Sequence, residues 1–201
     1  MKAMRKLLFT LALAVLSQVS FGQAVNDQAI IPVSVTLNSI LRLTVVSGGN
    51  IDFVVNTIDQ YNNGINDLGA DARYHTNFTV SSSQDFDVTL AAEDATLMGQ
   101  DDPANTMPLD NIGFDLTETG SGDDPTNWTL PVDVLPLDQA AQLIVTGVAN
   151  FSAGDATKNN FTIQWRLGTQ ESAAMNTLSL LEQSLTPDRY ITNVFLELAP
   201  K

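Results

Sequence analysis

The sequence predicts an all-β protein, an antiparallel β-sandwich with Greek-key connections and at most one short helix. In most of its apolar segments, apolar residues recur at every second position, which is the spacing of strands with one buried face. Turns rich in Gly, Asn, Asp and Ser separate these segments, as they do in sandwiches. The chain shows almost none of the helical periodicity that the crossovers of a parallel sheet require. We therefore expect a series of short antiparallel strands joined by turns.

In the first half of the chain, the expected strands all show this alternation. They span residues 31–37, 40–46, 51–55, 73–80 and 86–91. A serine-rich turn that ends in Gln84 and Asp85 separates the last two segments, which predicts a hairpin. Residues 56–72 are rich in Asn, Asp and Gly and are expected to form a long loop.

The second half of the chain supplies the remaining strands. They span residues 112–116, 128–135, 142–151, 160–167 and 190–198. Pro131 makes its own segment an edge strand or a bend, because proline cannot donate to a ladder. Residues 171–183 carry apolar residues near helical spacing, with Pro187 beyond their end, and predict a short helix. A strand at 177–181 is the alternative for this segment.

The N-terminal segment has the layout of a secretory signal peptide. Basic residues come first, an apolar run at 7–16 follows, and small and polar residues occupy 17–24. The basic residues are Lys2, Arg5 and Lys6. The apolar run is too short for a membrane-spanning helix, which needs about 20 residues. The segment therefore predicts export.

Cleavage is expected after Gly22 or after Ala24, since each has a small residue two positions before it. We expect residues 25–201 to form a single β-sandwich domain without membrane insertion after cleavage. The expected location is the periplasm, the cell surface or the extracellular medium, and the signal segment is typical of a bacterium.

The mature chain is strongly acidic and contains no cysteine. The signal segment holds three of the nine basic residues and none of the 23 acidic ones, so the mature net charge is 6 minus 23, or −17. Such a charge repels nucleic acid and anionic lipid, and neither is expected as a partner. Without disulfides, the domain must be stabilised by its core, by bound ions or by assembly.

The sequence predicts no enzymatic activity. His75 is the single histidine, and it lies at the opposite parity to its inward-facing neighbours, Tyr74 and Thr76, so it is expected to face water. Ser-His-Asp catalysis needs a histidine as its base, and a water-facing surface histidine is a poor candidate for this role. The chain also has no G-x-S-x-G motif. A glycoside hydrolase-like pair of loop carboxylates remains an alternative, because such a pair is defined by its distance in space.

A structural calcium ion is the one cofactor that the sequence suggests. Hard cations prefer carboxylate, amide and backbone oxygens, and the loop around Gly64 is rich in them. Its candidate ligands are Asp59, Asn62, Asn63, Asn66, Asp67 and Asp71. Two further acidic clusters comprise Glu93, Asp94, Asp101 and Asp102, and Asp123 with Asp124. The alternative interpretation is ordinary turn composition, because turns favour the same residue types.

Two aromatic residues are candidates for carbohydrate binding. Tyr61 lies in the polar loop and Trp128 follows a turn, so both rings could stack on sugars at the surface. Trp165 alternates with Phe161 and Ile163 and is expected in the core instead. A carbohydrate- or calcium-dependent binding module is therefore an alternative function.

Three segments resemble secreted bacterial fimbrial or pilin-type subunits. They are IIPVSVTL at 30–37, MPLDNIGFDL at 107–116 and LTPDRYITNVFLEL at 185–198. The resemblance implies an Ig-like or pilin-like sandwich with a structural or adhesive role at the cell surface. Its implied partners are copies of the same chain or other cell-surface proteins.

The resemblance also suggests a mode of assembly. An alternating N-terminal segment can complete the sheet of a neighbouring subunit by strand addition. Residues 25–37 are the candidate segment. The alternative is that they pair within their own domain, as most strands do.

Overall fold

The computed structural model describes residues 30–66, 72–121 and 126–201. The chain divides into two compact units, Met1–Leu37 and Asn38–Lys201. The expected signal peptide and its cleavage sites lie outside the described residues. Within those residues, no helix is both long and apolar enough to span a membrane.

Residues 30–37 form neither a helix nor a strand, so the strand expected at 31–37 is wrong for this structure. The alternating apolar side chains are exposed instead. Their exposed fractions are 81% for Ile31, 84% for Val33, 78% for Val35 and 90% for Leu37. A strand needs a partner for its backbone N–H and C=O groups. Residues 31–37 have alternating side chains but no such partner strand among the described residues.

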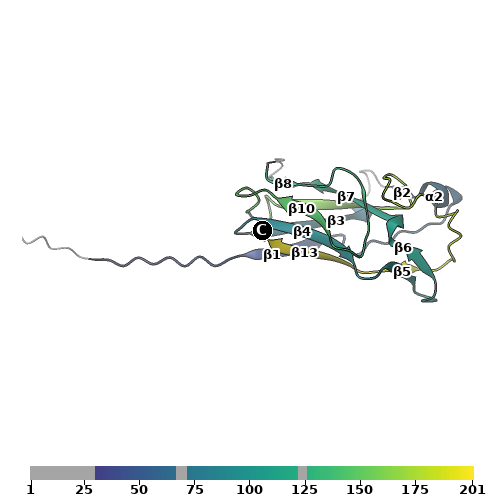
Figure 1. Cartoon of the computed structure of the whole chain (residues 1–201), viewed down its shortest axis with the longest axis horizontal. Coiled ribbons are helices and arrows are strands. Elements are labelled where there is room, and N and C mark those ends of the chain that lie inside the picture. Colours follow the sequence, from purple (N-terminus) through teal and green to yellow (C-terminus); the bar gives the residue numbers. More distant parts are fainter. Residues whose placement is uncertain (1–29, 67–71, 122–125) are drawn as a thin grey trace, which may run out of the picture. The chain divides into compact units, whose positions relative to one another are not determined.

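The second unit confirms the predicted fold class. Its strands form two main antiparallel sheets and one small sheet (Figure 1). In order, the first sheet contains β1 (Leu41–Ser47), β3 (His75–Ser82), β11 (Asn160–Leu167), β7 (Ile112–Glu118) and β9 (Leu135–Pro136), and β2 (Ile65–Asn66) also pairs with β11. The second sheet contains β13 (Val194–Pro200), β4 (Phe86–Ala92), β10 (Gln142–Gly147) and β8 (Trp128–Thr129). The small third sheet contains β12 (Tyr190–Ile191), β5 (Thr96–Gly99) and β6 (Thr106–Pro108).

The core lies between the inner faces of the two main sheets. Alternate residues of β3, β4 and β11 are buried, as the period of two predicts. Phe161 is fully buried at the centre, where its ring lies 5.3 Å from Phe78 and 5.2 Å from Trp128. Trp165 is 7% exposed, so its expected place in the core is confirmed.

The predicted hairpin between residues 73–80 and 86–91 is wrong. β3 pairs with β1 and β11 in the first sheet, whereas β4 pairs with β10 and β13 in the second. Both strands present their alternate apolar residues to the same core. The turn between them therefore carries the chain from one sheet to the other.

Residues 51–55 are buried at alternate positions but form no strand. Ile51, Phe53 and Val55 are half-buried and pack against the core, while Asp52 and Val54 are exposed. The alternation therefore identified the inward-facing side chains correctly. It did not reveal that the backbone runs past the edge of the sheet without a partner strand.

The polar segment 56–72 contains a short helix that the sequence analysis missed. Thr57 is the N-cap of helix α2 (Ile58–Asn63), and its side chain accepts a hydrogen bond from the Gln60 backbone N–H. The Gln60 side chain in turn accepts from the Thr57 backbone N–H. This reciprocal capping box satisfies two otherwise unpaired donors, and the T-x-x-Q spacing is its signature in the sequence. The short 3₁₀ turns η1 (Ala72–Tyr74) and η2 (Leu109–Asn111) complete the helical content of the described residues.

Residues 171–183 form turns, so both the helix expected there and the alternative strand at 177–181 are wrong. The polar side chains of the segment compete with regular structure. The Ser179 hydroxyl and backbone N–H both donate to Glu182, and Gln183 exchanges hydrogen bonds with the buried side chain of Asn111. Short polar side chains favour such local bonds over a helix.

Two other expected strands are divided in the structure. Residues 128–135 contribute the edge strands β8 and β9 to different sheets, with Pro131 between them, as the prediction of an edge or bend allowed. Residues 190–198 divide into β12 of the third sheet and β13 of the second.

Candidate functional site

The second unit contains a groove with a volume of ≈ 750 Å³ that is lined by both apolar and polar residues. Buried residues of the sandwich form its floor, and these include Leu90, Leu97, Met107, Ile163, Trp165 and Leu167. Residues 48–55, which follow β1, and residues 185–194, which lead into β13, also line it. The groove thus reaches from the core to the side of the sandwich where these two segments run.

β1 and β13 are edge strands, and they lie against each other on this side of the sandwich (Figure 1). β1 pairs with β3 and β13 pairs with β4, and in the described residues no ladder joins β1 to β13. Apolar side chains remain partly exposed on both strands, with Val45 44% and Val194 36% exposed. An unpaired edge of this kind is a template for a further strand.

Residues 48–55, which we call the strap, are anchored at their first residue. Gly48 has a φ of +67°, a conformation that favours glycine. Its carbonyl accepts a 2.6 Å hydrogen bond from the Thr76 hydroxyl, which itself accepts a 2.9 Å bond from Trp165 Nε1. This chain of bonds fixes the start of the strap to the core.

Beyond Gly48, side-chain packing holds the strap in place. The Phe53 ring stacks on Tyr74 with centroids 4.6 Å apart. Asp52 and Arg189 form an ion pair across the rim at 3.6 Å, but both side chains are more than half exposed, and such pairs contribute about 0–1 kcal/mol. Residues 49–55 form no backbone–backbone hydrogen bond with any described residue.

Asp188 organises the segment on the opposite rim. Its carboxylate accepts hydrogen bonds from the Asn105 side chain at 2.8 Å and from the backbone N–H groups of Asp101 at 3.0 Å and Asp102 at 3.2 Å. The backbone N–H of Arg189 donates to it at 2.7 Å. These donors, Asn105 foremost, lower the pKa of Asp188 to about 2. These hydrogen bonds favour the ionised form of Asp188. They also tie the loop after β5 to the rim of the groove.

The lowered pKa of Asp188 predicts a pH-dependent stability. An unfolded aspartate has a pKa of about 3.9, so ionised Asp188 stabilises the folded state above that pH, and its contribution is lost as the pH falls towards the folded-state pKa of about 2. We expect Asp188→Asn to lower the thermal midpoint by a few degrees at neutral pH, and this difference should shrink as the pH falls through that range. The exposed Asp133 supplies the control, Asp133→Asn. An equal deficit for Asp188→Asn at every pH would contradict the assignment.

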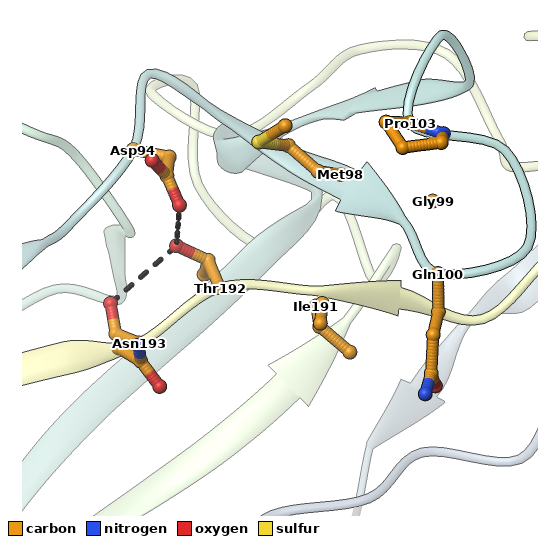
Figure 2. Close-up of a pocket in the computed structure, with 8 residues that line it drawn as sticks. All are labelled: Asp94, Met98, Gly99, Gln100, Pro103, Ile191, Thr192 and Asn193. Atoms are coloured by element: carbon orange, nitrogen blue, oxygen red, sulfur yellow. Dashed lines mark hydrogen bonds between the residues drawn. The ribbon is translucent and has the colours of Figure 1, made fainter.

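Figure 2 shows a second, smaller pocket of ≈ 300 Å³ beside β12. Thr192 lies between Asp94 and Asn193, and its hydroxyl donates to Asp94 Oδ2 at 3.4 Å. Met98 and Ile191 line the same pocket. Among the described residues, no three or more His, Cys, Asp or Glu side chains gather to hold a metal ion. Glu93, Asp94, Asp101 and Asp102 therefore do not come together as such a group.

The candidate calcium ligands are only partly described. Asp59, Asn62 and Asn63 lie on α2 and Asn66 on β2, whereas Asp67 and Asp71, like Asp123 and Asp124, lie outside the described residues. Asn63 donates to Asp59 at 2.8 Å, and Asn66 donates to Glu171. Hydrogen bonds within the protein therefore engage three of the candidate ligands. Calcium binding stays a prediction.

The two candidate sugar-binding rings lie in different environments. Trp128 is only 3% exposed, and its Nε1 donates to Glu118 at 2.7 Å. Its expected exposure is therefore wrong, because the ring packs edge-on against Phe161 in the core. Tyr61 is half-buried and lines the groove. The expected exposure of His75 is also only partly met, since its side chain is half-buried.

A buried arginine near the groove escaped the sequence analysis. Arg166 is 3% exposed, and its guanidinium lies 2.9 Å from Asp115 and 2.5 Å from Glu171. The alternation of β11 predicts that residue 166 faces outward, so the sequence carries no local signal for its burial. These ion pairs tie the loop after β11 to β7. That loop supplies Leu180 to the groove.

Comparisons with known proteins add no assignment. No protein-family model matches the chain, and no curated protein matches it.

Proposed function

We propose that this chain is an exported, non-enzymatic structural or adhesive surface protein that self-assembles by strand addition. In this proposal, residues 31–37 of one copy occupy the groove of another copy and extend one of its open edges. The supporting observation is the coexistence of two complementary features. One is a groove with an apolar floor beside two edge strands that each have one free edge in the described part of the chain, and the other is an exposed segment with apolar side chains at every second position.

The chemistry of the segment suits the groove. Ile31, Val33, Val35 and Leu37 fall on one face of an extended chain, and the polar Ser34 and Thr36 fall on the other. Burying four aliphatic side chains contributes about 1.5–3 kcal/mol each before the cost of ordering the segment. Backbone hydrogen bonds to an edge strand add affinity without regard to sequence, and the apolar face sets the register.

The alternatives have weaker support. A carbohydrate-binding face loses one of its two candidate rings, because Trp128 is buried. We found no described feature that singles out a pair of catalytic carboxylates. A binding module and a hydrolase remain the alternative functions. A negative result in the assembly experiment would favour them.

The experiment compares two double substitutions that add the same charge to the two faces of the segment. The processed wild-type chain is expected to form a concentration-dependent ladder of oligomers in size-exclusion chromatography with light scattering. Val33→Asp with Val35→Asp should abolish the ladder, because the two carboxylates would have to be buried in the groove. Ser34→Asp with Thr36→Asp should preserve it, since these side chains face away.

Two outcomes would count against assembly by strand addition. One is a wild-type chain that stays monomeric at every concentration, which would favour pairing within its own domain or a function without assembly. The other is a ladder that survives the two valine substitutions, which would place the interface elsewhere.

A further inference from the structure

We infer that the strap, residues 48–55, is an internal placeholder that occupies part of the groove and is displaced when the strand of another copy binds. This inference rests on the proposed function and adds a means of regulating it. A groove that is partly filled by its own chain is protected from indiscriminate apolar contacts until a matching strand arrives.

The strap carries the same side-chain pattern as the segment that we propose enters the groove. Ile51, Phe53 and Val55 are half-buried at every second position, and Asp52 and Val54 between them are exposed. All of residues 48–55 line the groove. The strap therefore supplies the groove with alternating apolar side chains, as residues 31–37 would.

The strap is held less firmly than a strand would be. Residues 49–55 form no backbone–backbone hydrogen bond with a described residue, whereas an incoming strand could pair with the free edge of β1 or β13. The ion pair between Asp52 and Arg189 is exposed and weak. Exchange of the strap for an added strand would thus keep apolar burial and gain backbone hydrogen bonds.

Both ends of the strap are anchored, which allows its middle to leave without unfolding the sandwich. At one end, Gly48 is bonded to Thr76. At the other, the capping box of Thr57 and Gln60 fixes the start of α2. A segment with an unpaired backbone between firm anchors can open locally without unfolding of the whole domain.

The test uses the absence of cysteine in this chain. A single thiol is introduced as Ile51→Cys, on the inward face of the strap, or as Val54→Cys, on its exposed face, where the native side chain is 57% exposed. Both variants carry Val33→Asp and Val35→Asp, so that their own segment does not compete. A fluorescent peptide with the sequence of residues 25–37 is added, and its binding is followed by anisotropy.

If the strap is displaced, saturating peptide should raise the alkylation rate of the Ile51→Cys thiol several-fold. The Val54→Cys thiol should change by less than twofold, because it is exposed in both states. Far-UV circular dichroism establishes that each variant is folded. Should Ile51→Cys fail to fold, Val55→Cys tests the same face at the other end of the strap.

The outcomes separate the two proposals. Peptide that binds while the Ile51→Cys thiol reacts at an unchanged or slower rate overturns the placeholder role and leaves strand addition standing. Peptide that does not bind at all overturns strand addition and the placeholder role with it.

Discussion

Replacement of Phe161 by alanine is expected to lower the free energy of unfolding by about 3–5 kcal/mol, the range for large aromatic side chains removed from a core. Phe161 is fully buried, stacks against Phe78 and meets the edge of Trp128. Strands from both main sheets surround the ring, so the cavity left by Phe161→Ala can collapse only in part. Urea unfolding followed by tryptophan fluorescence measures the loss.

Phe151→Ala is the matched control. This phenylalanine is 53% exposed, and its removal should change stability by no more than about 0.5 kcal/mol. Similar losses for the two variants would mean that Phe161 is not at the centre of the core. The position of the sandwich core in the structure would then be in error.

Gly48→Ala should be the second strongly destabilising change, with an expected loss of about 2–4 kcal/mol from backbone strain and crowding together. A Cβ atom at this position would lie 1.8 Å from the carbonyl oxygen of His75 and 2.8 Å from the Cα atom of Thr76. Backbone atoms cannot move aside as a flexible side chain can. The positive φ of Gly48 adds strain for any other residue.

Gly49→Ala is the control for this change, because it alters the adjacent residue in the same way. The nearest atom to its added Cβ is a side-chain carbon of Val45 at 4.0 Å, an ordinary contact distance. We expect thermal and urea unfolding of this variant to match the wild type closely. Equal losses at the two glycines would show that the strap begins with a different backbone geometry.

The strands were predictable wherever burial on one face of a sheet imposes a period of two. β11 covers residues 160–167 as expected, and β7 begins at Ile112, the expected first residue. In both, the inward residues are the ones that the alternation identified. The physical reason is that a half-buried strand cannot change this period without exposing its core side chains.

Strand pairing was not predictable in the same way. β3 and β4 were expected to pair, but they belong to different sheets. Two strands of opposite sheets and two strands of one hairpin show the same alternation, because each has one face towards the same interior. A short turn between them does not distinguish the two arrangements.

The groove could not be predicted from the sequence for a related reason. Its floor comes from strands far apart in the chain, and its rim comes from segments without regular structure. Residues 51–55 were identified as an alternating segment. They pair with no described strand, because the chain leaves the sheet after β1 ends at Ser47. The burial of Arg166 depends likewise on a loop that covers the outer face of β11. The sequence itself showed the alternation at 31–37 and 51–55, and the resemblance to pilin-type subunits suggested strand addition.

The two sides of the sandwich differ in the length of their edges. β1 and β13 each run for seven residues, whereas β9 and β8 on the opposite side have two residues each, and β9 includes Pro136. β8 and β9 themselves offer little for another chain to pair with, because each has two residues and β9 contains a proline. Under the proposed strand addition, the longer edges of β1 and β13 would form the joint for an incoming neighbour. If the proposed head-to-tail joint does not close into a ring, it would build an open filament one molecule wide.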